Sequence, residues 1–248
     1  MPFTTEHIEK LRPCYECLCK IKEFKEGYVK FFPQVGEHYF NGNHKKIMVV
    51  GKACNSWVEA GTSSETDKLF NADGTGIVNR KDQMKWVKEA WSRKKGKYST
   101  SHSAFWTFSR KVADSILGTK GINCFYYIAW SNLYKVSPCQ GGNPDQEDRN
   151  KQVVICTDIF KKELEILKPD FVFFFTSGWE KTFVDNFKSE DSEVSKDKWS
   201  TYEIESFISE ITQNHRTVFV CTQHPQGKPF NLHLEAIEKA LNYWECKK

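Results

Sequence analysis

The sequence lacks long hydrophobic runs. None of its apolar stretches reaches the length of about 18 residues that a membrane-spanning helix needs. The opening segment MPFTTEHIEK also lacks the apolar stretch of a secretory signal. We therefore expect no membrane insertion and no export, and a cytoplasmic location.

Signatures of two enzyme classes are missing from the segment GKACNSW, residues 51–57. Its glycine spacing is not that of a P-loop, which excludes that way of wrapping phosphates. It also lacks the second glycine of a nucleophile elbow. A thiol hydrolase is still an alternative, with Cys54 as the nucleophile and His224 as its base, because this cysteine follows an apolar segment at a sharp turn.

The composition favours one folded domain over residues 1–248. Hydrophobic residues make up 39% of the chain and aromatic residues 15%, which is enough to bury a sizeable core. The formal net charge of +4 permits a polyanionic partner without requiring one. In a reducing compartment the nine cysteines are thiols, metal ligands or core residues rather than disulfides.

Four short apolar runs alternate with longer helical patterns. The runs cover residues 46–50, 122–130, 171–176 and 217–222. They are apolar nearly throughout, as in parallel strands that are buried on both faces. Helical spacing covers residues 145–168, 200–212 and 232–244. The alternation predicts a three-layer α/β/α sandwich with a central, mostly parallel sheet of about four strands.

The segments that follow the four strands are polar. They read GKACNSW, SNLYKVSPCQGGNPDQ, SGWEK and QHPQGKPFN in chain order. Ligands of such sheets bind beyond the carboxyl ends of the strands. We therefore expect the four segments to converge on one cleft. The charged run 188–198, by contrast, is predicted to be a surface loop.

Residues 79–117 form a basic and aromatic insertion. One interpretation is a pair of amphipathic helices with their tryptophans inward and their lysines in water. The other is a face that contacts phosphates, and the two are compatible. The basic side chains of that face would be Arg80, Lys81, Arg93, Lys94, Lys95 and Lys97.

The order of the strand-end segments resembles the uracil-DNA glycosylase superfamily. The matching stretches are VVGKACN, FYYIAWSN, LKPDFVFFFTSG and VFVCTQHPQG. They correspond to a glycine-led first loop, a strand that ends in asparagine, an apolar strand after a KP step, and a late HP loop. The resemblance covers most of the chain, and it implies DNA as partner.

The iron–sulfur branch of that superfamily is closest in layout. Its pattern implies a 4Fe–4S cluster held by Cys14 and Cys17 of an N-terminal arm, residues 1–45, with Cys139 and Cys156. Cys139 lies three residues later than the pattern would place it. Zinc in the same site and no metal at all are the alternatives, because thiolates also bind zinc and cysteine is often simply buried.

The resemblance assigns roles in base recognition. Asn132 corresponds to the asparagine that reads the base edge, since an amide both donates and accepts hydrogen bonds. His224 corresponds to the histidine that stabilises the departing base, for which a neutral imidazole suffices. Phe70 is our prediction for the aromatic platform under the base.

Further residues are predicted to contact DNA. The segment QGKPFN resembles the minor-groove loop of the family, in which Gln226 or Phe230 would wedge into the base stack. The same loop contributes Lys228. The first loop contributes Lys52 and Ser56 as further DNA contacts.

The residue that activates water departs from the family pattern. The family has an Asp, Glu or Asn close to the glycine of the first loop, where this chain has Lys52 and Ala53. Asn55 is the nearest replacement and would orient a water molecule without acting as a strong base. Carboxylates that could fold back instead are Glu59, Asp67 and Asp73.

These observations and the resemblance predict a DNA glycosylase that extrudes a base and hydrolyses its bond to the sugar. They leave the oligomeric state open and favour a monomer. The altered first loop favours a damaged or modified base, such as the modified bases of phage DNA, over plain uracil. DNA repair and phage defence are the corresponding roles. The alternative is a nucleic-acid-binding relative that has lost catalysis, which the residues Lys52 and Ala53 favour.

Overall fold

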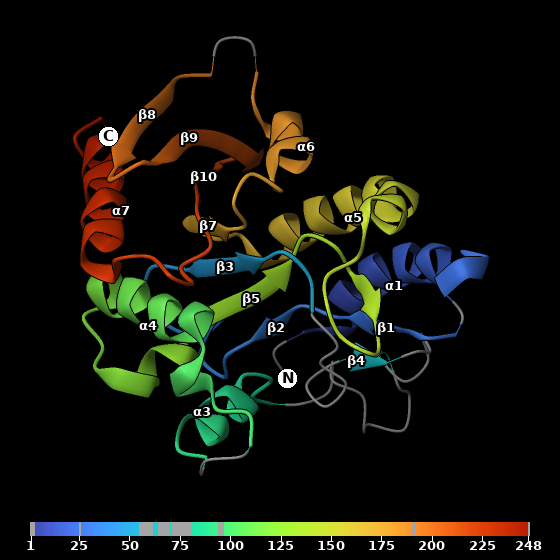
Figure 1. Ribbon diagram of the computed structural model, residues 1–248. Coiled ribbons are helices and arrows are strands. Elements are labelled where there is room, and N and C mark those ends of the chain that lie inside the picture. Colours follow the sequence, from blue (N-terminus) through green and yellow to red (C-terminus); the bar gives the residue numbers. More distant parts are fainter. Residues whose placement is uncertain are drawn as a thin grey trace.

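The computed structural model describes residues 3–24, 26–54, 62–63, 70, 81–93, 97–189 and 192–247. A mixed seven-stranded sheet runs through its centre (Figure 1). In spatial order the strands are β2 (Gln34–Val35), β5 (Ile128–Asn132), β3 (Ile47–Gly51), β7 (Phe171–Phe175), β10 (His215–Thr222), β9 (Tyr202–Thr212) and β8 (Val194–Trp199).

The four predicted strands form the parallel centre of this sheet. β3 pairs in parallel with β5 and with β7, and β7 pairs in parallel with β10. β3, β5 and β7 are buried at every position, which explains why their sequences are apolar without alternation. The first half of the second run instead forms a 3-10 helix, Gly121–Tyr126.

The sheet is larger than predicted because antiparallel strands extend it on both sides. β2 pairs with β5, and the hairpin of β9 and β8 continues from β10. The predicted helix over 200–212 is wrong, since this segment is β9. Its helix-like spacing has a simple cause: Ile204 and Ile208 face one hydrophobic cluster, whereas Phe207 and Ile211 face the other. Part of the predicted surface loop 188–198 is the edge strand β8.

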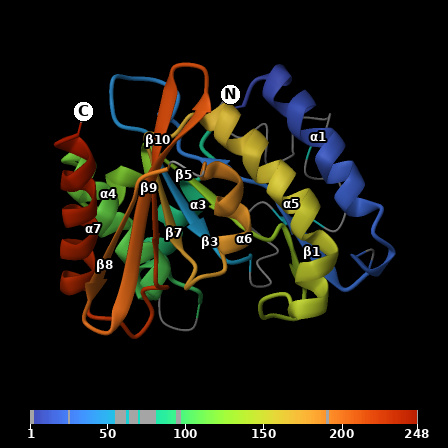
Figure 2. The same cartoon turned by 90° about the horizontal axis from the view of Figure 1, so that it is seen from above.

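Helices pack against both faces of the sheet (Figure 2). One face carries α1 (Thr5–Cys19), α5 (Gln146–Leu167) and α6 (Lys181–Val184), and the other carries α4 (Ala104–Leu117) and α7 (Phe230–Glu245). Adjacent strand residues divide between the two clusters, as the pleat requires. Met48 belongs to the α1 and α5 side, and Val49 to the α4 and α7 side.

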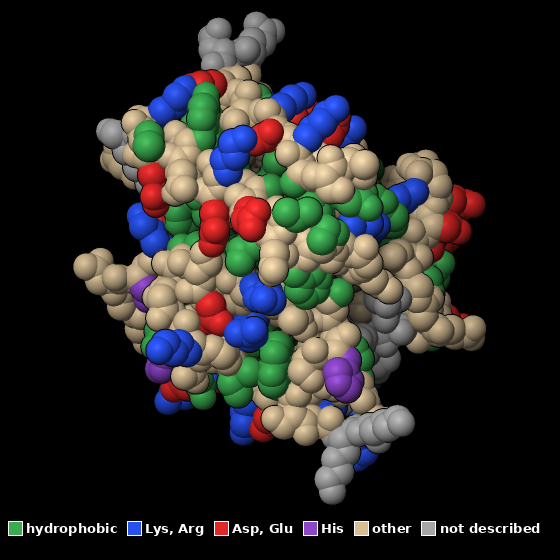
Figure 3. Space-filling view, turned by 60° about the vertical axis from the view of Figure 1, so that its left-hand side comes forward, with side chains coloured by type: hydrophobic (Ala, Val, Ile, Leu, Met, Phe, Trp, Pro, Cys, Tyr) green, Lys and Arg blue, Asp and Glu red, His purple; other side chains and the backbone are tan. Residues whose placement is uncertain are grey.

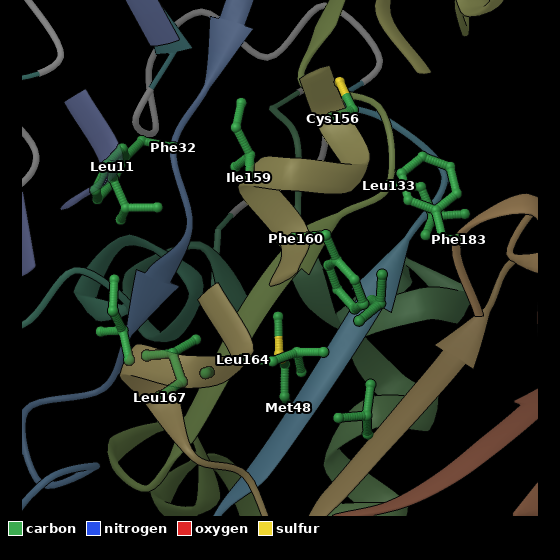
Figure 4. Close-up of a cluster of buried hydrophobic side chains, with 14 of the residues drawn as sticks. Leu11, Phe32, Met48, Leu133, Cys156, Ile159, Phe160, Leu164, Leu167 and Phe183 are labelled. Atoms are coloured by element: carbon green, nitrogen blue, oxygen red, sulfur yellow. The ribbon is translucent and has the colours of Figure 1, made fainter. Parts of the chain in front are cut away.

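The predicted helix over 145–168 is confirmed as α5. Its N-cap Asp145 accepts the backbone N–H of Asp148 at 2.8 Å, which satisfies an otherwise unpaired donor. The helix ends at Leu167, and its C-cap Lys168 directly precedes Pro169. Phe160 and Leu164 project from α5 toward Met48 of β3 (Figure 4). The predicted helix over 232–244 is also confirmed, within α7.

The remaining elements are short. A second sheet has the order β4 (Thr62–Ser63), β1 (Tyr28–Phe31) and β6 (Val136–Pro138), all antiparallel. The basic insertion contributes α3 (Lys85–Trp91) as well as α4. Further 3-10 helices cover Lys22–Phe24, Thr100–His102 and Asp185–Phe187. Among the residues that the structure describes, no helix is both long and apolar enough to cross a membrane.

Candidate functional site

A cleft of about 620 Å³ lies beyond the carboxyl ends of β3, β5 and β10. Three of the four predicted strand-end segments line it, and the start of α4 forms its opposite wall. The remaining segment, which follows β7, does not line the cleft, but its Ser177 accepts the backbone N–H of His224. The lining side chains discussed below are Lys52, Cys54, Lys97, Phe105, Asn132, His224 and Gln226.

Gly51 and Asn132 lie opposite each other where β3 and β5 end. A Cβ atom at position 51 would lie 2.5 Å from Asn132 Oδ1, well inside the contact distance of real Cβ atoms. The glycine is therefore required by the amide beside it and not by its own backbone angles. The space that a side chain at position 51 would fill is thus occupied by the Asn132 amide.

Asn132 carries a buried donor with no partner. The residue is only 1% exposed, and its Nδ2 has no hydrogen-bond partner within the described part of the chain. An unsatisfied buried donor destabilises a fold by about 1–3 kcal/mol. Because Asn132 lines the cleft, a ligand with an acceptor atom there would remove that penalty.

A buried ion pair holds the backbone of Asn132 in place. Lys135 Nζ lies 2.6 Å from the carbonyl oxygen of Asn132, 2.7 Å from Ser131 Oγ and 2.7 Å from Glu163 Oε1. The side chains of Lys135 and Glu163 are completely buried. Removing one partner of such a pair costs about 3–5 kcal/mol, so the position of the strand end is strongly determined.

His224 is neutral and its tautomer is fixed. Burial, reinforced by the positive charges of Lys52 and Lys228, lowers the pKa of His224 to about 4. Its Nδ1 accepts the backbone N–H of Gln226 at 3.3 Å, so the ring proton resides on Nε2. Ser177, which follows β7, accepts the backbone N–H of His224 at 2.9 Å. The neutral ring can therefore donate one hydrogen bond from Nε2.

Phe105 supplies the aromatic surface beside His224 in the cleft, which Tyr98, Trp106 and Trp130 also line. It lies in the first turn of α4, and its ring is nearly parallel to that of His224 at 21°, with 6.3 Å between centroids. Sequence reasoning missed this role because the aromatic residues of the insertion were interpreted as a core-facing stripe or a phosphate-binding face. The AFWTF pattern did contain a signal, since Trp106 and Phe108 are the buried residues and Phe105 is offset from them.

The prediction that Phe70 forms the aromatic platform is not supported by its position. Phe70 is 3% exposed and belongs to the hydrophobic core. Its ring packs edge-on against Tyr15 and Phe32, with 5.5 and 5.2 Å between centroids. It does not line the cleft. A phenylalanine that is enclosed by other rings has no face left for a base.

The structure describes three of the six side chains predicted for the basic face, Lys81, Arg93 and Lys97. Lys81 pairs with Glu37 at 2.6 Å. Arg93 is exposed, and Lys97 lines the cleft. Arg80, Lys94 and Lys95 lie outside the described residues. On the side that carries α4 and α7, basic and acidic side chains are interleaved (Figure 3).

Residues of the late HP loop lie in two environments, the cleft and the hydrophobic core. Gln226 is exposed and lines the cleft, which keeps it a candidate for the wedge. Phe230 begins α7 and packs against Phe108, with 5.2 Å between ring centroids. Its predicted role as a wedge conflicts with that packing. Lys228 lies 4.5 Å from the ring centroid of Tyr202.

The four predicted cluster ligands differ in environment. Cys17 and Cys139 are exposed and Cys14 is half-buried, whereas Cys156 is fully buried. Its thiol donates to Gln152 at 3.3 Å, and burial raises its pKa to about 12. Within the described ranges, no three Cys, His, Asp or Glu side chains are grouped to hold a metal ion. The cluster, with zinc as its alternative, therefore stays a prediction from the sequence resemblance.

The water-activating residue cannot be placed among the described residues. Its candidates all lie outside them: Asn55, Glu59, Asp67 and Asp73. The predicted DNA contact Ser56 lies outside them as well. The described residues that line the cleft include no Asp or Glu. Cys54 does line the cleft, where it is 3% exposed.

Paired substitutions can separate the roles of Phe105 and Phe70. Phe105→Leu should weaken ligand binding about tenfold, because stacking of a base on an aromatic ring contributes about 1–3 kcal/mol. Phe70→Leu should lower the free energy of unfolding and leave binding unchanged. Binding isotherms and urea unfolding of both variants provide the measurement. The assignment is wrong if Phe70→Leu is the variant that loses binding.

Gly51→Ala should disable the cleft through Asn132. The added methyl group would displace the Asn132 amide, so ligand affinity should fall as far as in Asn132→Ala. In the double variant the methyl group occupies space that the amide has left, and no further loss is expected. A double-mutant cycle measures this coupling. Additive losses would show that the two residues act independently.

The low pKa of His224 predicts a specific acid sensitivity. The unfolded chain takes up this proton near pH 6.5 and the folded protein only near pH 4, so stability should fall as the pH drops through that window. An NMR titration of the ring should give a midpoint near 4, and His224→Gln should reduce the acid sensitivity. A midpoint near 6.5 would contradict the buried, neutral ring.

Comparison with known proteins adds no family assignment. No protein-family model matches the chain, and no curated protein matches its sequence. The geometry of the cleft is therefore the basis on which a function is proposed.

Proposed function

We propose that the cleft binds a base extruded from DNA and hydrolyses its N-glycosidic bond. The main support is the buried Nδ2 of Asn132, which has no partner in the part of the chain that the structure describes, in the same cleft as a neutral His224. Phe105 adds an aromatic surface beside the histidine. A planar heterocycle with carbonyl oxygens would satisfy the free donors and stack on the ring.

The residues suit the charge that develops in this reaction. Water adds to C1′ of the deoxyribose, the C1′–N bond breaks, and its electron pair leaves on the base, which finally takes up the proton that water releases. The Nε2–H of neutral His224 would donate to the base oxygen as negative charge accumulates there. A cationic imidazolium is not needed for that role, which agrees with the low pKa of this ring.

The proposal also includes a three-layer fold and DNA as the partner. Helices that pack on both faces of the sheet support a three-layer α/β/α sandwich. DNA is the proposed partner, bound at the cleft through Lys52, Lys97 and Gln226, with a monomer as the acting unit. The sequence resemblance to uracil-DNA glycosylases supports the same reaction class.

A nucleic-acid-binding protein without catalysis is the second candidate. It is favoured by the absence of a carboxylate among the described residues that line the cleft. A glycosylase would then depend on Asn55 or on a carboxylate of the first loop, outside the described residues. A thiol hydrolase would instead depend on Cys54, which lines the cleft with His224.

Release of a base can be tested by alkaline strand cleavage at the abasic site. Oligonucleotides with uracil, hypoxanthine or glucosylated hydroxymethylcytosine are incubated with the protein, treated with alkali and separated on a gel. At least one should break at the modified position. His224→Ala should slow the reaction about 10²–10³-fold, the effect of removing one donor from a developing oxyanion.

Three control variants sharpen the assay. Asn242→Ala alters an exposed asparagine near the C-terminal end of α7 and should leave the rate unchanged, whereas Asn132→Ala should lower it. Cys54→Ala should also retain activity, since a glycosylase needs no thiol. No break on any substrate, together with salt-sensitive DNA binding, would reject catalysis in favour of the binding protein. Loss of activity in Cys54→Ala would favour the hydrolase.

A further inference from the structure

The side chains of Lys52 and Arg149 both lie over the ring of Trp179 at the edge of the cleft. Lys52 Nζ lies 4.9 Å from the ring centroid of Trp179, and Arg149 Cζ lies 4.1 Å from it. The three residues come from the loop after β3, the loop after β7 and the start of α5. Trp179 also packs edge-on against Tyr134. Both cations are thus held in one small region by a ring that is itself packed.

Neither cation has an anionic partner in the described part of the chain. Arg149 Nη2 donates to the neutral amide oxygen of Gln146 at 2.5 Å, while its buried Nε has no acceptor there. No ion pair joins Lys52 or Arg149 to a carboxylate within those residues. The nearby Glu180 is buried and accepts the hydroxyl of Thr176 instead.

The charges of Lys52 and Arg149 oppose each other. Burial, and then the positive charge of Arg149, lowers the pKa of Lys52. Like charges that are held together in a half-buried place destabilise the free protein. An anion bound between Lys52 and Arg149 would offset their repulsion and stabilise the protein. Lys52 also lines the cleft, so the anion would lie next to the bound base.

We propose that Lys52 and Arg149 together bind one phosphate of the DNA strand that flanks the extruded nucleotide, with Trp179 holding both side chains in position. This inference rests on the proposed function, since it takes the cleft to hold the base. The guanidinium offers planar donors to a phosphate and the ammonium adds a second charge. The pair would fix the strand relative to Asn132 and His224.

The salt dependence of DNA binding tests this contact. The ligand is a duplex with one tetrahydrofuran abasic analogue, and affinity is measured by fluorescence anisotropy at several salt concentrations. Each neutralised phosphate contributes about −0.9 to the slope of log K against log salt. Arg149→Gln and Lys52→Gln should each make the slope less negative, and the double variant should make it less negative by about 0.9 in total, because a single phosphate contact is lost.

Two further arginine variants separate charge from structure. Arg149→Lys keeps the charge and should keep the slope, although it loses the planar contact with Trp179. Arg216→Gln removes an exposed arginine near the opposite end of β10 and should leave the slope unchanged. An unchanged slope in both Arg149→Gln and Lys52→Gln would overturn the proposal. So would an equal change in Arg216→Gln.

Uncharged methylphosphonates then identify the phosphate. Replacing the phosphates one at a time should reveal one position where the wild-type protein loses affinity and Arg149→Gln loses none. If every substitution affects both proteins equally, the proposal fails.

The outcomes also distinguish this site from the glycosylase reaction. A protein that releases no base, but whose slope depends on Arg149, rejects catalysis and supports the phosphate contact. A protein that releases a base with a slope independent of both cations rejects the phosphate contact alone.

Discussion

The parallel pairing of β3 with β5 sets Gly51 opposite Asn132, and the cleft depends on that register. A shift by one residue would turn Asn132 to the other face of the sheet. It would also remove the only residue type that leaves room for the Asn132 amide, because any side chain at position 51 collides with it. The backbone bonds from Leu133 to Gly51 and from Tyr134 to Lys52 continue the pairing past the strand ends. The first loop is thereby positioned beside the asparagine.

Buried polar groups then position the two candidate site residues. Lys135 and Glu163 fix the carbonyl of Asn132 from beneath, and Ser177 and Gln226 fix His224 from the side. These contacts are internal, in contrast to the amide donor of Asn132 itself, which has no partner among the described residues. Rigid support beneath an unsatisfied donor is the arrangement expected of a preorganised binding site.

The sequence predicted correctly those elements whose residue pattern is set by burial. The runs ending at Gly51 and Asn132 were recognisable as strands because burial on both faces removes polar residues. The hairpin strand β9 was mistaken for a helix because Ile204 and Phe207, three residues apart, are buried on opposite faces. Phe105 was missed, and Phe70 predicted in its place, because the offset of Phe105 from Trp106 and Phe108 indicates another side of the helix but not that a cleft of the tertiary fold lies there. Lys52 was predicted as a DNA contact, but its position beside Arg149 on Trp179 was not, since the three residues are far apart in the chain.

The central claim is that the free amide of Asn132 faces the ligand. The most direct measurement is the NMR spectrum of the side-chain amides in ¹⁵N-labelled protein during titration with the tetrahydrofuran duplex and free base. The account predicts that the Asn132 amide resonances, assigned with Asn132→Ala, shift on saturation while those of Asn242, exposed near the C-terminal end of α7, stay in place. Saturable binding that leaves the Asn132 amide unchanged would contradict it.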